Sequence, residues 1–168
     1  LLGANIVGFS VYVWNFQISL EIARRIKKRD PNALIIFGGP HVPDYETENF
    51  LRKYDFIDLA VHGEGERTLT DIIENFRVQN WSDVDGLSFI NYQGLYIRTT
   101  TRQRLRNLSE IPSPLLDGTF ESLMKANPDE KWIGLWETNR GCPFKCTFCD
   151  WGSATAAKLN KFEIDRLQ

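Results

Sequence analysis

Residues 6–13 (IVGFSVYV) decide the class of fold. Their apolar members are mostly β-branched or aromatic and show no helical spacing, which predicts a strand buried on both faces. The next segment has a different period, because Ile18, Ile22 and Ile26 recur every four residues and Pro31 follows them. This spacing predicts an amphipathic helix with the isoleucines on its apolar face. A strand followed by such a helix is typical of a βα unit.

The same alternation continues to about residue 78. Residues 33–37 (ALIIF) predict a second buried strand, residues 46–53 a short helix, and residues 57–61 a third strand. Another apolar helical pattern follows the segment 63–66 (GEGE). Strands that alternate with helices in this way predict right-handed crossovers. We therefore expect an α/β fold with an incomplete, Rossmann-like, doubly wound parallel sheet.

The character of the sequence changes after residue 78. Residues 86–90 and 95–98, separated by NYQG, predict a β-hairpin, and the Arg-rich residues 98–106 predict a solvated face. Residues 132–137 (WIGLWE) predict a new buried strand just before three cysteines. We expect three parts, which are a Rossmann-like domain at 1–78, a hairpin-containing linker at 79–130, and the start of a second domain at 131–168.

Composition argues against several classes of partner. The net charge is −2, from 20 basic and 22 acidic residues, so no general attraction to nucleic acid or anionic lipid is encoded. The most apolar stretch is interrupted by polar residues and is shorter than the roughly 18–20 residues of a membrane span. We expect neither a nucleic-acid nor a membrane partner. The sequence begins with Leu1 and its only methionine is Met124, so we expect a piece of a longer protein.

All three cysteines fall in one short segment, at Cys142, Cys146 and Cys149. Their odd number and close spacing disfavour a disulfide framework. Thiolates are soft ligands that favour zinc, copper(I) or iron–sulfur clusters. A structural zinc ion would take its fourth ligand from Asp150 or a distant histidine, and a redox-active thiol pair is a further alternative. An iron–sulfur cluster held by three cysteines would leave one iron open to a substrate or cofactor.

The segment 141–149 (GCPFKCTFC), placed after a predicted strand, resembles the signature of radical S-adenosylmethionine (SAM) enzymes. The resemblance implies that Cys142, Cys146 and Cys149 hold a 4Fe-4S cluster whose open iron is chelated by SAM. It also implies that Phe148 lies beside the adenine of SAM, and that residues 131–168 begin a partial (β/α) barrel. No further catalytic residue is predicted beyond the cluster ligands.

Three loops follow the predicted parallel strands, at residues 10–15, 38–41 (GGPH) and 63–66 (GEGE). Open parallel sheets bind ligands at this carboxyl edge, and glycines there let a ligand approach the backbone. Tight turns between strand and helix are the alternative explanation of these glycines. The chain has no G-x-G-x-x-G or G-x-x-x-x-G-K run, which argues against a dinucleotide or a nucleoside triphosphate. His41 and His62 are more simply loop histidines bonded to backbone than cofactor ligands.

Taken with the cysteine motif, these loops resemble those of the cobalamin-binding radical SAM enzymes. The resemblance implies a sheet of the cobalamin-binding type with the vitamin on its carboxyl edge. Tyr12 stands where the better-known cobalamin pattern has leucine. The residues implied in cobalamin binding are Ser10, Gly38, Gly39, Pro40, Gly63, Glu64, Gly65 and Glu66.

The resemblance implies a methyltransferase that acts on an unactivated carbon through a 5′-deoxyadenosyl radical and methylcobalamin. The implied cofactors are a 4Fe-4S cluster, SAM and cobalamin. Ring closure or rearrangement with the same cofactors, or a non-catalytic cobalamin- or zinc-binding module, are the alternatives. We expect a small-molecule or peptide substrate, an electron donor such as flavodoxin or ferredoxin, and a reducing cytoplasm as the location. The piece by itself is expected to be inactive.

Overall fold

The computed structural model describes residues 3–134, 137–142, 144, 147–148 and 159–162. The chain divides into two compact units, Leu1–Arg104 and Leu105–Gln168, which are considered separately below. In the described part of the chain, no helix has the length and apolar character needed to cross a membrane.

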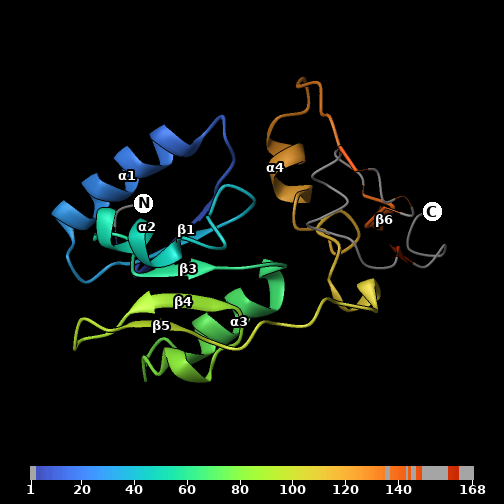
Figure 1. Cartoon of the computed structure of the whole chain (residues 1–168). Helices are drawn as coiled ribbons and strands as arrows, with labels where there is room; N and C mark the ends of the chain where they lie inside the picture. Colours follow the sequence, from blue (N-terminus) through green and yellow to red (C-terminus); the bar gives the residue numbers. More distant parts are fainter. Residues whose placement is uncertain (1–2, 135–136, 143, 145–146, 149–158, 163–168) are drawn as a thin grey trace. The chain divides into compact units, whose positions relative to one another are not determined.

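The first unit is built from alternating strands and helices followed by a hairpin (Figure 1). Its elements are β1 (Ile6–Ser10), α1 (Phe16–Arg29), β2 (Leu34–Gly38), α2 (Thr47–Lys53), β3 (Leu59–Val61), α3 (Gly65–Asn75), the 3-10 helix η1 (Trp81–Asp83), β4 (Leu87–Ile90) and β5 (Tyr96–Arg98). The predicted βα alternation is therefore confirmed, and the fold is α/β.

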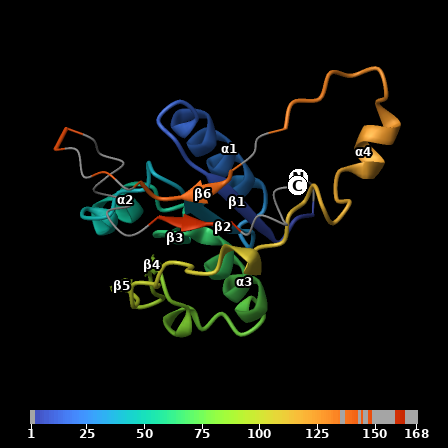
Figure 2. The same cartoon turned by 90° about the vertical axis from the view of Figure 1, so that its right-hand side faces the viewer.

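The five strands form one sheet in the order β1-β2-β3-β4-β5. The first three are parallel, with Ser10 opposite Gly38 and Phe37 opposite Ala60. β4 runs antiparallel to β3, and β5 runs antiparallel to β4, so the sheet is mixed. Helices α1 and α3 lie on opposite sides of its parallel strands (Figure 2). The predicted hairpin exists, but it is part of this sheet and not of a separate linker, and the compact unit extends beyond residue 78 to Arg104. A two-stranded hairpin is marginal alone, and pairing with β3 gives it a partner and a buried face.

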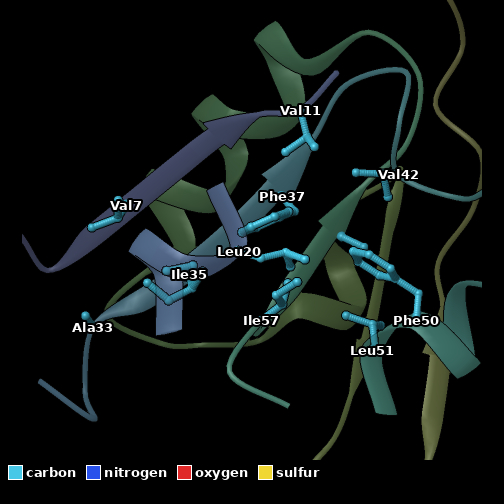
Figure 3. Packing of buried hydrophobic residues seen from close by; sticks show 12 residues of the cluster. Val7, Val11, Leu20, Ala33, Ile35, Phe37, Val42, Phe50, Leu51 and Ile57 are labelled. Carbon is cyan, nitrogen blue, oxygen red and sulfur yellow. The ribbon is translucent and has the colours of Figure 1, made fainter. Parts of the chain in front are cut away.

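Two apolar layers hold the sheet between its helices. Along β2, Ile35 and Phe37 enter the cluster that contains residues of α1 and α2, whereas Leu34 and Ile36 enter the cluster that contains Ile72 of α3. Figure 3 shows the first cluster, in which Phe37 lies among side chains from several elements. Side chains alternate in this way because successive residues of a strand point to opposite faces. The prediction of a strand buried on both faces is confirmed for β2.

The first predicted strand and its helix differ from expectation in two details. The strand ends at Ser10 and not at residue 13, and Val13 is 72% exposed. On α1, Ile18 and Ile22 are 61% and 36% exposed, while the buried residues are Ser19, Leu20 and Ala23. The spacing of the isoleucines predicted the helical period correctly, and Ile26 packs against the core, but Ile18 and Ile22 lie outside the buried stripe. The stripe that faces the sheet contains Ser19, Leu20 and Ala23, and the last two belong to the core cluster.

The second unit contains the 3-10 helix η2 (Leu108–Glu110), helix α4 (Glu121–Ala126) and the short antiparallel pair β6 (Asn139–Arg140) and β7 (Asn160–Lys161). Of the strand predicted at 132–137, residues 132–134 and 137 are described and belong to no strand. Strand pairing begins only at Asn139, where β7 supplies a partner. Trp132 and Ile133 are 46% and 91% exposed, so they do not form the expected buried strand.

Candidate cofactor site at the carboxyl edge of the sheet

The three parallel strands bring their following loops to one edge of the sheet. Two backbone hydrogen bonds join the first two loops: the Val11 N–H donates to the Gly38 oxygen at 2.7 Å, and the His41 N–H donates to the Val11 oxygen at 3.1 Å. The third loop begins at His62, whose N–H donates to the Gly86 oxygen at 2.9 Å. The loops predicted as a ligand site therefore do lie at the same end of the parallel strands.

Gly39 and Gly63 occupy this edge in different ways. Gly39 has φ of +103°, and a Cβ there would lie 2.7 Å from the Val11 oxygen and 2.9 Å from the Val11 nitrogen. Its close approach is thus to protein backbone, which fits the tight-turn explanation. Gly63 has φ of +73° and is exposed, and a Cβ there would meet no atom within 4 Å. The space beside Gly63 is open, and that beside Gly39 is filled.

Asn15 organises the loop between β1 and α1. Its Oδ1 accepts a hydrogen bond from the Tyr12 N–H at 2.7 Å, and its Nδ2 donates to the Ser10 oxygen at 2.9 Å. The rings of Tyr12 and Trp14 stack with centroids 4.6 Å apart and an interplanar angle of 11°. Ser10 is exposed and Trp14 is 77% exposed. Sequence reasoning missed Asn15, although asparagine just before a helix is a recognised turn and cap signal.

The GEGE segment forms the start of α3. Gly65 begins the helix, Glu64 stands at its N-cap position, and Glu66 lies in its first turn. Acidic side chains are favoured at a helix N-terminus because the peptide dipoles give that end a partial positive charge. Glu64 also pairs with Arg104, with 3.6 Å between Oε1 and Nε. Pro40 is exposed in the preceding loop.

Three arginines from β5 onward bind acidic groups around this edge. Arg98 pairs with Asp44 at 2.8 Å, and Arg104 pairs with Glu64. Arg102 pairs with Asp71 and also donates from Nε to the Thr68 hydroxyl oxygen at 2.8 Å. The expectation of a solvated face at residues 98–106 is therefore wrong for the partly buried Arg102 and Arg104, whereas Arg98 is exposed as expected and also pairs with Asp44. Their partners lie on α3 and on the loops after β2 and β3. These partners are far from the arginines in the sequence, so no local pattern predicts the pairs.

His62 has side-chain partners on both ring nitrogens. Nδ1 lies 3.0 Å from Asp44 Oδ1, and Nε2 lies 2.8 Å from Ser88 Oγ. Burial lowers the pKa of His62, the nearby Arg98 lowers it further, and Asp44 opposes the change. His41 differs, because its ring packs edge-on against Phe16 with centroids 4.6 Å apart.

The predicted cluster ligands are only partly described. Cys142 is a partly buried free thiol, whereas Cys146 and Cys149 lie outside the described residues. Phe148, predicted beside the adenine of SAM, is 91% exposed. Within the described residues, no group of three metal-ligating side chains is assembled. The three ligands are therefore a prediction from the motif, and the donor set of three thiols suits an iron–sulfur cluster chemically.

Comparisons with known proteins bear on both units. Residues 2–73 match the model of the B12 binding domain family. Over 98% of its length the chain is 38% identical to the cobalamin-dependent radical SAM methyltransferase TokK of Streptomyces tokunonensis, and 37% identical to a 2-(S-pantetheinyl)-carbapenam-3-carboxylate methyltransferase of Streptantibioticus cattleyicolor. It covers 24% of each, so it spans about a quarter of the length of these relatives.

A solved structure shares the fold. The cobalamin-dependent SAM radical enzyme OxsB, with aqua-cobalamin and SAM bound, superposes on 97% of this chain with a TM-score of 0.71 and 25% identity, and the chain covers 22% of it. Residues 2–73 are thus a B12-binding domain with a Rossmann-like fold. The chain as a whole is a relative of the cobalamin-binding radical SAM enzymes, as its loops and cysteines predicted.

Proposed function

We propose that this chain is the cobalamin-binding and cluster-bearing segment of a radical SAM methyltransferase that acts on an unactivated carbon. The observation that carries the proposal is the presence, in one chain, of a B12-binding domain at residues 2–73 and three cysteines at 142, 146 and 149. A cobalamin carrier alone has no need of the cysteines. A zinc module has no need of the glycine-rich sheet edge.

The residues at the sheet edge suit a large, flat cofactor. Ser10 is exposed at the end of β1, and the open space beside Gly63 leaves room at the end of β3. We infer that cobalamin contacts Ser10, Gly38, Pro40 and the GEGE segment, while Gly39 shapes the floor by packing on Val11. Pre-formed loops of this kind bind a ligand without a large cost of ordering.

The cysteine segment would hold the second cofactor. We infer that the thiolates of Cys142, Cys146 and Cys149 bind a 4Fe-4S cluster, and that the exposed Phe148 contacts SAM. When bound, these cofactors supply one-electron cleavage of SAM and a cobalt-carried methyl group, and the protein orients them and excludes water. The electron would come from a donor such as flavodoxin or ferredoxin, and the substrate is a small molecule or a peptide.

Anaerobic reconstitution of the full-length protein tests the cluster. We expect about four irons per chain and a broad visible absorption, because three thiolates and SAM together complete the ligation of such a cluster. Cys146→Ala is expected to abolish both signals, whereas Ser122→Ala, an exposed position on α4, leaves them unchanged. Tightly bound zinc with no iron uptake would overturn the assignment.

A second experiment tests the cobalamin site. Ser10→Tyr places a large ring at the carboxyl edge, and Gln93→Tyr places the same ring in the β4–β5 turn, at the opposite end of the sheet. In a titration of the full-length protein with aquacobalamin, followed by visible absorption, we expect Ser10→Tyr to weaken binding at least about tenfold. Gln93→Tyr is expected to bind like the wild type. Equal binding by both variants would place the cofactor elsewhere.

A further inference from the structure

Four side chains form a continuous hydrogen-bonded line behind the loop that follows β2. Asp44 Oδ1 lies 3.0 Å from His62 Nδ1, His62 Nε2 lies 2.8 Å from Ser88 Oγ, and Ser88 Oγ lies 3.0 Å from the Tyr96 hydroxyl. The four residues come from the loop after β2, the end of β3, β4 and β5. The line therefore connects the hairpin to the proposed cofactor edge.

Chemistry fixes the direction of these hydrogen bonds. The His62 side chain is 8% exposed, and Ser88 beside it is buried. Burial disfavours the charged form of the imidazole, so His62 is taken as neutral. The carboxylate of Asp44 can only accept, so Nδ1 of His62 carries the proton and donates it. Nε2 then accepts from the Ser88 hydroxyl, whose oxygen accepts from Tyr96. Each hydrogen bond in the line thus has one donor and one acceptor, and the donors run from Tyr96 to Ser88, from Ser88 to His62 and from His62 to Asp44.

The contacts run from Asp44 to His62 to Ser88, as in a nucleophilic triad, but the serine is not accessible to a substrate. Ser88 has no solvent-exposed surface, and its oxygen is already engaged by Tyr96. A nucleophilic serine must reach a substrate carbonyl, which this one does not. The line is therefore an anchor for backbone and not a hydrolytic site.

What the line anchors is the loop that contains Gly39, Pro40 and His41. Near its start, this loop is joined to the loop after β1 by the hydrogen bond from the His41 N–H to the Val11 oxygen. The far end of the loop contains Asp44, whose side chain is 66% exposed. Its carboxylate binds His62 and Arg98. An exposed carboxylate fixed by a buried imidazole holds the loop against the sheet.

We propose that His62 is a positioning residue of the cofactor site, which locks the loop after β2 through the Nδ1–H bond to Asp44. The proposal deepens the proposed function, because this loop forms part of the inferred cobalamin site. The charged and titratable groups that face His62 are Asp44, Arg98 and, through Ser88, Tyr96. Arg98 still binds the carboxylate and the backbone oxygen of Asp44, so loss of the His62 donor is expected to loosen the loop while the rest of the sheet stays paired.

Two isosteric variants separate the two ends of the imidazole. His62→Asn keeps an N–H at the position of Nδ1, toward Asp44, and His62→Gln keeps a polar group at the position of Nε2, toward Ser88. Tyr96→Phe keeps the packing and removes only the far end of the line. In the full-length protein without cofactor, we expect amide hydrogen exchange in residues 39–44 to be about tenfold faster in His62→Gln than in His62→Asn or Tyr96→Phe.

Aquacobalamin affinity provides the second readout. We expect His62→Gln to bind about tenfold more weakly than His62→Asn, even where urea unfolding finds the two variants equally stable. Equal loop exchange in the Asn and Gln variants would overturn the positioning role. Failure of the wild type to bind aquacobalamin would instead refute the proposed function, and the exchange comparison would still decide the role of His62.

Discussion

Replacing Gly39 by alanine probes the closest backbone approach in the site. The new Cβ would lie 2.7 Å from the Val11 oxygen, and the residue would keep a φ of +103°, which L side chains rarely adopt. Backbone strain of this kind costs about 1–3 kcal/mol, and overpacking a filled site costs about 1–3 kcal/mol. We therefore expect Gly39→Ala to lower the free energy of unfolding by about 2–6 kcal/mol, a large share of the 5–15 kcal/mol typical of a domain.

Two other glycines serve as matched controls. Gly63→Ala carries the strain of φ at +73° but meets no atom within 4 Å, so it should cost about 1–2 kcal/mol. Gly8→Ala carries neither penalty and should stay within about 0.5 kcal/mol of the wild type. Urea unfolding of the chain, followed by tryptophan fluorescence, gives the three values. If Gly39→Ala unfolds at the same urea concentration as Gly8→Ala, the backbone contact described between Gly39 and Val11 does not exist.

Two further predictions concern how ion pairs and pH affect the free energy of unfolding. Asp58→Ala should cost about 1–3 kcal/mol in urea unfolding, because the Ile35 N–H loses its carboxylate acceptor and Lys27 Nζ keeps only the Ala33 oxygen. Glu48→Ala removes a half-exposed ion pair with Arg52 and should cost about 0.5 kcal/mol or less, and equal costs for the two variants would contradict this. Burial lowers the pKa of His62 below the usual 6.5, so the unfolded chain takes up the proton first and stability should fall as the pH drops below about 6.5. Unfolding measured at several pH values should show a shallower fall in His62→Asn, and an identical slope would refute the assignment.

The sequence predicted those parts of the fold that depend on local period. The run of apolar residues in 33–37 predicted β2 because a strand covered on both faces needs apolar side chains on both. The isoleucines of α1 gave the period, but only Ile26 packs against the core, since the stripe that faces the sheet is set by tertiary packing and not by the local pattern. The hairpin was predicted as a hairpin, but its partner β3 is set by pairing across more than twenty residues, which no local pattern encodes.

The candidate site was predictable in part for similar reasons. The glycines after β2 and before α3 stand out in the sequence because few residue types tolerate positive φ or close approach. Asp44 and Ser88 do not stand out, since their roles depend on partners in other loops or strands, whereas Asn15 binds within its own loop and carried a local signal. His62 was noticed as a histidine but not as the centre of a line of side chains. Its partners lie 18 and 26 positions away in the sequence.

The antiparallel hairpin has a consequence for engineering. β4 runs away from the carboxyl edge of the parallel strands, and β5 runs back toward it. The turn at residues 91–94 is therefore the part of the hairpin farthest from the proposed ligand. Its tip residues Tyr92 and Gln93 are exposed. A fluorescent reporter or affinity handle grafted into that bend would sit apart from the chemistry, whereas the same graft near Arg98 would intrude on it.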